Sequence, residues 1–137
     1  MVKTDYDVQR NAVIMELIGD VDAEQAEAAF VDLNRLIQKH GMGLAFMIDL
    51  SRAESIKPTV KSAIEQTMEL LDKMGVKEIL RVLPDPAMVI GFNVMSIGHY
   101  HHHPKINTFH SRVDADTYLK QVLLSNAAHQ GERSEGA

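Results

Sequence analysis

Four histidines cluster in the second half of this 137-residue chain, at His99, His101, His102 and His103. Neutral imidazole is the commonest protein ligand for transition metals. A helix would place His99 on the same face as His102 or His103, and His110 on the following segment could supply a further ligand. We take His99, His101 and His103 as candidate metal ligands. The more usual alternative is a solvated helix end, where protonated imidazoles complement the helix dipole.

A second group of polar side chains follows the apolar stretches that we predict to be strands. In an open α/β sheet, ligands and partners bind beyond the carboxyl ends of the parallel strands. Aspartates at these ends could form an acidic rim that holds Mg²⁺, although strand-end aspartates and serines more often form turns and helix caps. The candidate partner- or ligand-binding residues are Asp20, Asp49, Ser51, Ser55, Thr59 and Asp85.

The composition and the motifs exclude several classes of protein. The chain has no cysteine, which excludes disulfides, thiolate zinc sites, iron–sulfur clusters and a cysteine nucleophile. No Ser-His-Asp order, glycine-rich phosphate loop or HExxH pattern is present. The formal net charge is -5, there is no tryptophan, and no dense run of Lys and Arg occurs, so we expect no binding to nucleic acid. We also expect no catalytic residues and no cofactor.

The periodicity of the apolar residues predicts strands that alternate with helices. Four amphipathic segments begin with helix-start residues, at Asp22, Pro58, Asp85 and Asp114. The second of them follows a loop predicted over residues 52–57. Five short apolar segments are predicted as strands: residues 6–9, 13–18, 44–48, 78–83 and 106–109.

This order indicates one α/β domain over residues 1–126, followed by a tail, residues 127–137, that we expect to be disordered. We predict a mostly parallel five-stranded sheet with about four helices packed on it and with the first strand antiparallel at the edge. Hydrophobic residues make up 45% of the chain, which is enough for a core. No stretch is long and apolar enough to span a bilayer, so we expect no integral membrane segment and a cytoplasmic protein.

Three segments carry a resemblance to a known family. They are Ile18-Gly-Asp-Val-Asp22, Met47-Ile-Asp-Leu-Ser51, and the residues from Phe109 to Leu119. Over roughly residues 8–124, the chain resembles the STAS domains (sulfate transporter and anti-sigma-factor antagonist), and more closely their SpoIIAA-like group. The resemblance implies the STAS fold and a non-catalytic regulatory role in which the domain binds a protein partner.

One departure from the family concerns its phosphorylation switch. In the antagonist proteins, an Asp-Ser pair stands at the start of the helix after the Asp-Leu-Ser strand, and phosphorylation of that serine switches partner binding. Here the corresponding residues are Lys57 and Pro58, and Pro58 has no hydroxyl. We therefore do not carry the phosphoserine switch over to this chain, although Ser55, Thr59 and Ser62 lie nearby.

The leading hypothesis is a regulatory module that presents residues 19–22, 49–59 and 84–86, with the adjacent helix, to a protein partner or to its own copy as a homodimer. The alternative is a carrier of a small lipid-like ligand in a pocket between the sheet and the third helix. Eight methionines and the similarity of the SpoIIAA-like fold to lipid-binding CRAL-TRIO domains favour it. A metal-binding protein built on the histidines is a weaker alternative. The apolar stretch 87–97 is buried either within the chain or between chains.

Overall fold

The described residues form five strands and four helices. The structure, a computed structural model, describes the backbone of residues 1–41, 43 and 45–135, and within these ranges the side chains up to residue 124. A short 3-10 turn, Pro58–Val60, precedes the second helix. In chain order the elements are β1 (Val2–Asp7), β2 (Ala12–Val21), α1 (Ala23–His40), β3 (Ala45–Ile56), α2 (Lys61–Lys73), β4 (Glu78–Val82), α3 (Pro86–His99), β5 (Lys105–Phe109) and α4 (Arg112–Glu135).

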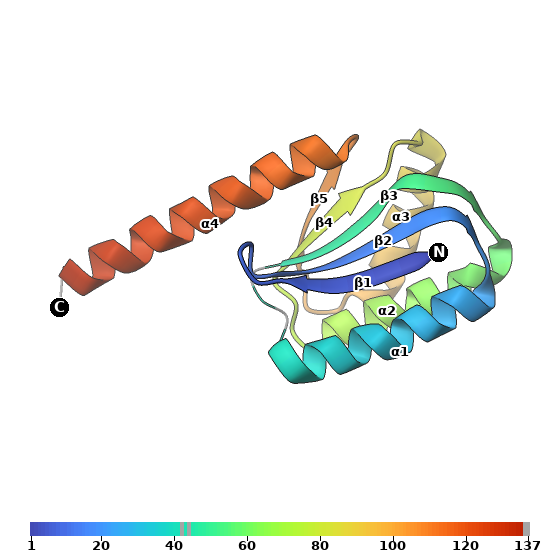
Figure 1. Cartoon of the computed structure of the whole chain (residues 1–137), viewed down its shortest axis with the longest axis horizontal. Helices are drawn as coiled ribbons and strands as arrows, with labels where there is room; N and C mark the ends of the chain where they lie inside the picture. The colour runs from blue at the N-terminus through green and yellow to red at the C-terminus, as the bar shows by residue number, and fades with distance from the viewer. Residues whose placement is uncertain (42, 44, 136–137) are drawn as a thin grey trace.

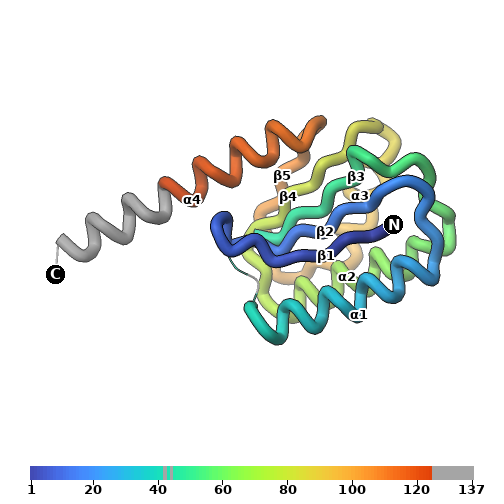
Figure 2. Tube along the Cα trace, in the orientation of Figure 1, coloured from blue at the N-terminus to red at the C-terminus, as the bar shows by residue number. Residues whose placement is uncertain are grey.

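The strands form a single sheet in the order β1-β2-β3-β4-β5, which is also their order along the chain (Figure 2). β1 pairs antiparallel with β2, and the other neighbouring strands are parallel. Helices α1, α2 and α3 lie on one face of the sheet and α4 lies on the other (Figure 1). The predicted fold class and the antiparallel edge strand are therefore confirmed.

Successive side chains of the central strands point to opposite faces of the sheet, and this divides the core into two layers. In β2, Val13 and Met15 face α1, α2 and α3, where they join the larger apolar cluster. Ile14 faces the opposite side and packs with Ala115 and Leu119 of α4 in the smaller cluster. The central strands are apolar on both faces because helices cover both.

The structure differs from the sequence prediction at the end of β3. Residues 52–56, predicted to lie in a loop, continue β3 beside the last residues of β2. Two register shifts occur in this part of the ladder, and most of its side chains are exposed. Backbone pairing with β2 therefore extends the strand beyond the buried region, where an apolar pattern gives no signal.

Smaller differences concern the ends of elements. β1 covers Val2–Asp7 instead of residues 6–9, and the turn that follows it contains Asn11 with a φ of 53°. The last helix begins at Arg112, two residues before the predicted cap. The Asp114 N–H donates to the Ser111 hydroxyl at 3.3 Å, so Ser111 caps this helix.

The side chains of residues 127–137 lie outside the described part of the chain. The disorder predicted for this tail therefore stays a prediction. None of the helices in the described ranges has the length and apolar character needed to cross a membrane.

Candidate functional site

Two of the predicted binding residues meet where β2 and β3 end. Asp20 and Ser55 are partners in the strand register, and the Ser55 hydroxyl donates a hydrogen bond to the Asp20 carboxylate. Thr59 lies exposed in the following 3-10 turn. The Lys57 N–H donates to the Val21 carbonyl at 3.1 Å, which holds the start of that turn against β2. Three of the candidates therefore lie at one exposed polar end of the sheet.

Asp49, in contrast, is only 3% exposed and holds α4 against the sheet. Its carboxylate accepts from the Ser51 N–H at 2.8 Å and from Arg112 Nη1 at 3.0 Å. Arg112 also contacts Asp116 at 2.9 Å and Glu16 at 3.6 Å. Burial alone would raise the pKa of Asp49, but the hydrogen bonds from Ser51 and Arg112 outweigh burial and hold this pKa below its ordinary value.

The aspartates do not converge into the acidic rim that the sequence suggested. Asp85 caps α3, because its carboxylate accepts from the Ala87 N–H at 2.9 Å. Asp22 forms a capping box with Gln25 at the start of α1. Within the described residues, no three His, Asp or Glu side chains are grouped so that they could hold a metal ion.

His99 joins α3 to α2. Its Nε2 lies 2.8 Å from a Glu65 oxygen and its Nδ1 lies 3.1 Å from a Glu69 oxygen. Both ring nitrogens therefore face carboxylates of α2. Through these two contacts His99 links α3 to α2.

Two other histidines of the cluster, His101 and His102, contact the carboxylate of Asp72. The His101 and His102 N–H groups donate to Asp72 at 2.9 and 3.0 Å, and His102 Nδ1 lies 3.1 Å from the same carboxylate. His103 is exposed and has a φ of 51°. The side chains of His99, His101 and His103 are not assembled into a site, and a metal-binding role for them stays a prediction.

The outer face of α3 is an exposed apolar surface. Ile90, Val94 and Ile97 are 67%, 66% and 84% exposed. A Cβ built on Gly91 or Gly98 would have no neighbour within 4 Å, so nothing obstructs this side of the helix. The sequence signalled an apolar helix, but it left open which face packs inside the chain.

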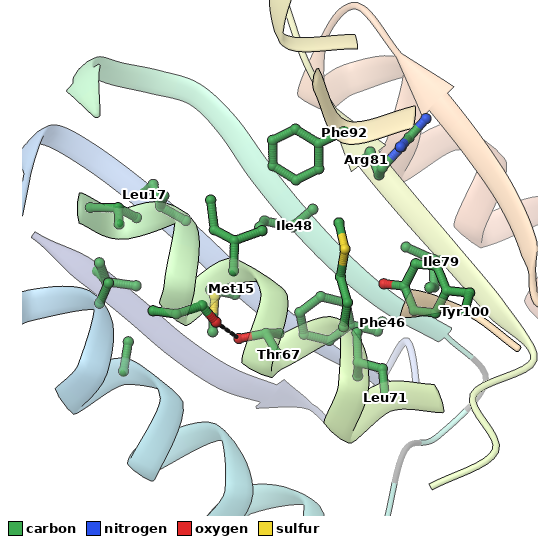
Figure 3. A pocket seen from close by; sticks show the side chains of 17 residues that line it. Met15, Leu17, Phe46, Ile48, Thr67, Leu71, Ile79, Arg81, Phe92 and Tyr100 are labelled. Atoms are coloured by element: carbon green, nitrogen blue, oxygen red, sulfur yellow. Dashed lines mark hydrogen bonds between the residues drawn. The ribbon is translucent and has the colours of Figure 1, made fainter. Parts of the chain in front are cut away.

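Beneath the helices lies a small apolar cavity (Figure 3). Its free space is about 40 Å³, while one water molecule requires about 10–15 Å³ by the same measure. Polar groups at its border include Thr67, whose hydroxyl donates to the Ala63 carbonyl at 2.9 Å, and Tyr100. Burial raises the pKa of the Tyr100 hydroxyl. Apolar side chains from four strands and three helices form most of the wall, among them Met15, Phe46, Ile48, Leu71, Ile79 and Phe92.

Arg81, which sequence reasoning did not single out, borders the cavity and is only 5% exposed. Its guanidinium points out of the cavity, past Phe92 (Figure 3). Nε and Nη2 donate to the Thr108 hydroxyl at 3.1 and 2.7 Å, and Nη2 donates to the Asn93 amide oxygen at 2.6 Å. Nη1 is buried and has no hydrogen-bond partner in the described part of the chain. A charged residue inside an apolar strand is the signal that could have drawn attention to it.

Comparison with known proteins identifies the fold. No protein-family model and no curated protein sequence matches the chain. The structure of the anti-sigma factor antagonist SpoIIAA in its unphosphorylated form is similar, with a TM-score of 0.64 and 14% sequence identity over 88% of this chain and 98% of that chain.

Two further solved structures lead to the same assignment. An uncharacterised protein with a SpoIIAA-like fold from Shewanella loihica PV-4 has a TM-score of 0.62 and 11% identity, over 87% of this chain and 92% of that chain. An anti-sigma factor antagonist from Mycobacterium paratuberculosis has a TM-score of 0.58 and 17% identity, over 88% and 95% of the two chains. At these identities the likeness establishes the fold alone. The chain has the SpoIIAA-like α/β fold of the STAS domains.

Proposed function

We propose that the protein is a cytoplasmic, non-catalytic regulatory module that acts by binding a protein partner through the outer face of α3. The fold is shared with anti-sigma-factor antagonists, which supports a regulatory interaction role. The observation that carries the proposal is the exposed apolar surface of α3. An apolar patch of this kind on a soluble domain marks an interaction site.

The sequence of α3 explains why this surface suits a protein partner. Ile90, Val94 and Ile97 follow one another at spacings of four and three residues, so their side chains lie on one side of the helix. No charged side chain occurs from Pro86 to Gly98. The helix is 14 residues long, or about 21 Å. An interface on this face alone falls at the small end of specific interfaces, which is typical of transient signalling contacts.

The polar end of the sheet supplies a second part of the proposed surface. α3 is the next helix after β4, and the parallel strands β2 and β3 end together at Val21 and Ile56, one residue after Asp20 and Ser55. Asp20, Ser55 and Thr59 are exposed there and suit the polar rim of an interface. Pro58 occupies the position where the antagonists carry the phosphorylated serine, so the proposal includes no phosphoserine at the start of α2.

The test compares Ile97→Asp with a matched control, Val31→Asp, which places the same charge at an exposed valine of α1. Affinity capture from the source cells, followed by titration of the purified captured protein, should show binding that Ile97→Asp weakens at least tenfold and Val31→Asp leaves unchanged. Sedimentation velocity over a range of concentrations tests the homodimer in the same variants. The proposal is wrong if Ile97→Asp binds the captured protein as tightly as the wild type does and also self-associates to the same extent.

A second candidate is a carrier of a small apolar ligand, which the cavity between the sheet and the helices that cover it favours. Its helical wall comes mainly from α1 and α2, with Phe92 from α3. Its free space of about 40 Å³ holds only a few atoms, so a long acyl chain requires these helices to move away from the sheet. Native mass spectrometry of the purified protein tests this candidate. An added lipid mass on the folded species would support it, and an unmodified mass would count against it.

A further inference from the structure

Arg81 is a buried cation whose hydrogen-bond partners are all neutral. It lies in β4 and reaches between α3 and β5 to the Asn93 amide and the Thr108 hydroxyl. These two groups leave Nη1 without a partner in the described residues. Burying a charge without a counter-ion is expensive, and proteins normally pair such a charge with an anion. An anion bound beside Arg81 would therefore compensate its buried charge.

Arg112 gives a direct comparison within the same molecule. It contacts the carboxylates of Asp49, Asp116 and Glu16, although its side chain is 25% exposed. Arg81 is far more deeply buried, and the described residues offer it no carboxylate within salt-bridge distance. Burial lowers the pKa of Arg81, whereas the hydrogen bonds that Arg112 donates to Asp116 and Asp49 outweigh burial and raise the pKa of Arg112.

We infer that Arg81 is the anchor of a carboxylate-binding site between α3 and β5. The Asn93 amide oxygen, 2.6 Å from Nη2, stands where one carboxylate oxygen would bind. Asn93 and Thr108 are both exposed, so a ligand that displaces the Asn93 side chain reaches the guanidinium from solvent. A carboxylate then offers an acceptor to Nη1 as well as to Nη2, in the two-pronged geometry that arginine favours.

The surroundings of the guanidinium indicate which carboxylates fit. The Phe92 ring lies beside it, with its centroid 6.0 Å from the guanidinium carbon. Phe92 and the stem of Arg81 both border the apolar cavity. An acid with a short hydrocarbon chain therefore finds apolar surface within reach of the charge. An Asp or Glu side chain of a protein partner carries the same carboxylate group.

The experiment is a titration of the full-length protein followed by NMR at the Nε–Hε signal of Arg81. Sodium acetate and sodium butyrate are compared with sodium chloride at equal ionic strength. We expect a saturable shift with both carboxylates, with dissociation constants on the order of millimolar, and no saturable shift with chloride. An unresponsive Arg81 signal, or an equal response to chloride, would overturn the inference.

The two carboxylates also distinguish the source of the anion. Butyrate has two more methylene groups than acetate, and burial of both strengthens binding roughly tenfold. Tighter binding of butyrate by that factor supports a free short-chain acid as the ligand. Equal binding of acetate and butyrate supports the carboxylate of a protein side chain.

Variants separate a ligand anchor from a merely structural arginine. In the absence of ligand, Arg81→Met should keep or raise the unfolding temperature, because it removes an uncompensated buried charge. The same variant should no longer be protected by butyrate against thermal unfolding. Arg112→Met should destabilise the fold but keep the butyrate response. The exposed Arg35→Met is a control if Arg112→Met does not fold. Unchanged protection by butyrate in Arg81→Met would refute the assignment of the site.

Discussion

Replacement of Asp49 by asparagine tests whether this residue is a structural anchor or part of a ligand site. Asparagine has nearly the same shape and keeps an acceptor for the Ser51 N–H, so the change removes mainly the charge that faces Arg112 at 3.0 Å. Breaking a fully buried ion pair costs about 3–5 kcal/mol. Arg112 keeps Asp116 and Glu16 and is a quarter exposed, so we expect a smaller loss, of about 2 kcal/mol, in the free energy of unfolding.

The pH dependence gives this prediction a second readout. The pKa of Asp49 in the folded protein lies below its ordinary value of 3.8. The stabilisation is therefore fully present above that value and is lost as the pH falls through the folded pKa. Urea unfolding of the wild type and Asp49→Asn should differ by about 2 kcal/mol near neutral pH, and the difference should shrink as the pH falls below 3.8.

The control for this prediction is Asp32→Asn on the surface of α1. The Asp32 carboxylate lies 3.6 Å from Arg35 and its side chain is 59% exposed. A surface pair of this kind contributes about 0.5 kcal/mol or less. The reasoning fails if Asp49→Asn costs no more than Asp32→Asn or if the difference is independent of pH. An Asp49→Asn variant more stable than the wild type would instead mark Asp49 as a strained ligand-binding residue.

Three further predictions concern the stability of the fold, and chemical denaturation measures each. Gly43→Ala should cost about 3 kcal/mol or more, because Gly43 has a φ of 69° and an added Cβ would lie 2.2 Å from the Asn11 carbonyl oxygen. The fully buried Leu33→Ala should cost about 2–5 kcal/mol, whereas Val31→Ala, at an exposed position of the same helix, should cost far less. Asp22→Ala should cost about 1 kcal/mol, because it removes the capping box of α1.

The sequence predicted those parts of the fold that depend on neighbours along the chain. Asp22 and Gln25 sit three residues apart, and the structure contains both hydrogen bonds of their capping box. Gly41, which directly follows His40 in the sequence, ends the same helix. The apolar runs at β2, β3 and β4 placed the central strands for the same reason. These signals are local, so they can be interpreted without the tertiary structure.

The roles of the candidate site residues could not be derived in this way. Asp49 was predicted to bind a partner or ligand because it ends an apolar run, but it is buried against Arg112, which lies 63 residues further along the chain. Within the described residues Arg81 has no counter-ion, because the groups that α3 and β5 place beside it, Asn93 and Thr108, are neutral. Both facts depend on long-range packing. Charge and position in the sequence therefore identified polar candidates without revealing which of them are already paired.

Helix α3 connects the two proposals, because it carries both the outer apolar face and Asn93, which lies over Arg81. Val94 belongs to the exposed face and directly follows Asn93 in the chain. A carboxylate that displaces the Asn93 side chain therefore acts within one residue of the proposed partner surface. Thermodynamic linkage then requires equal effects in both directions: if the acid changes the affinity for the partner, the partner changes the affinity for the acid by the same factor. Helix α3, whose buried residues are Phe92 and Ser96, is the element through which such coupling would act.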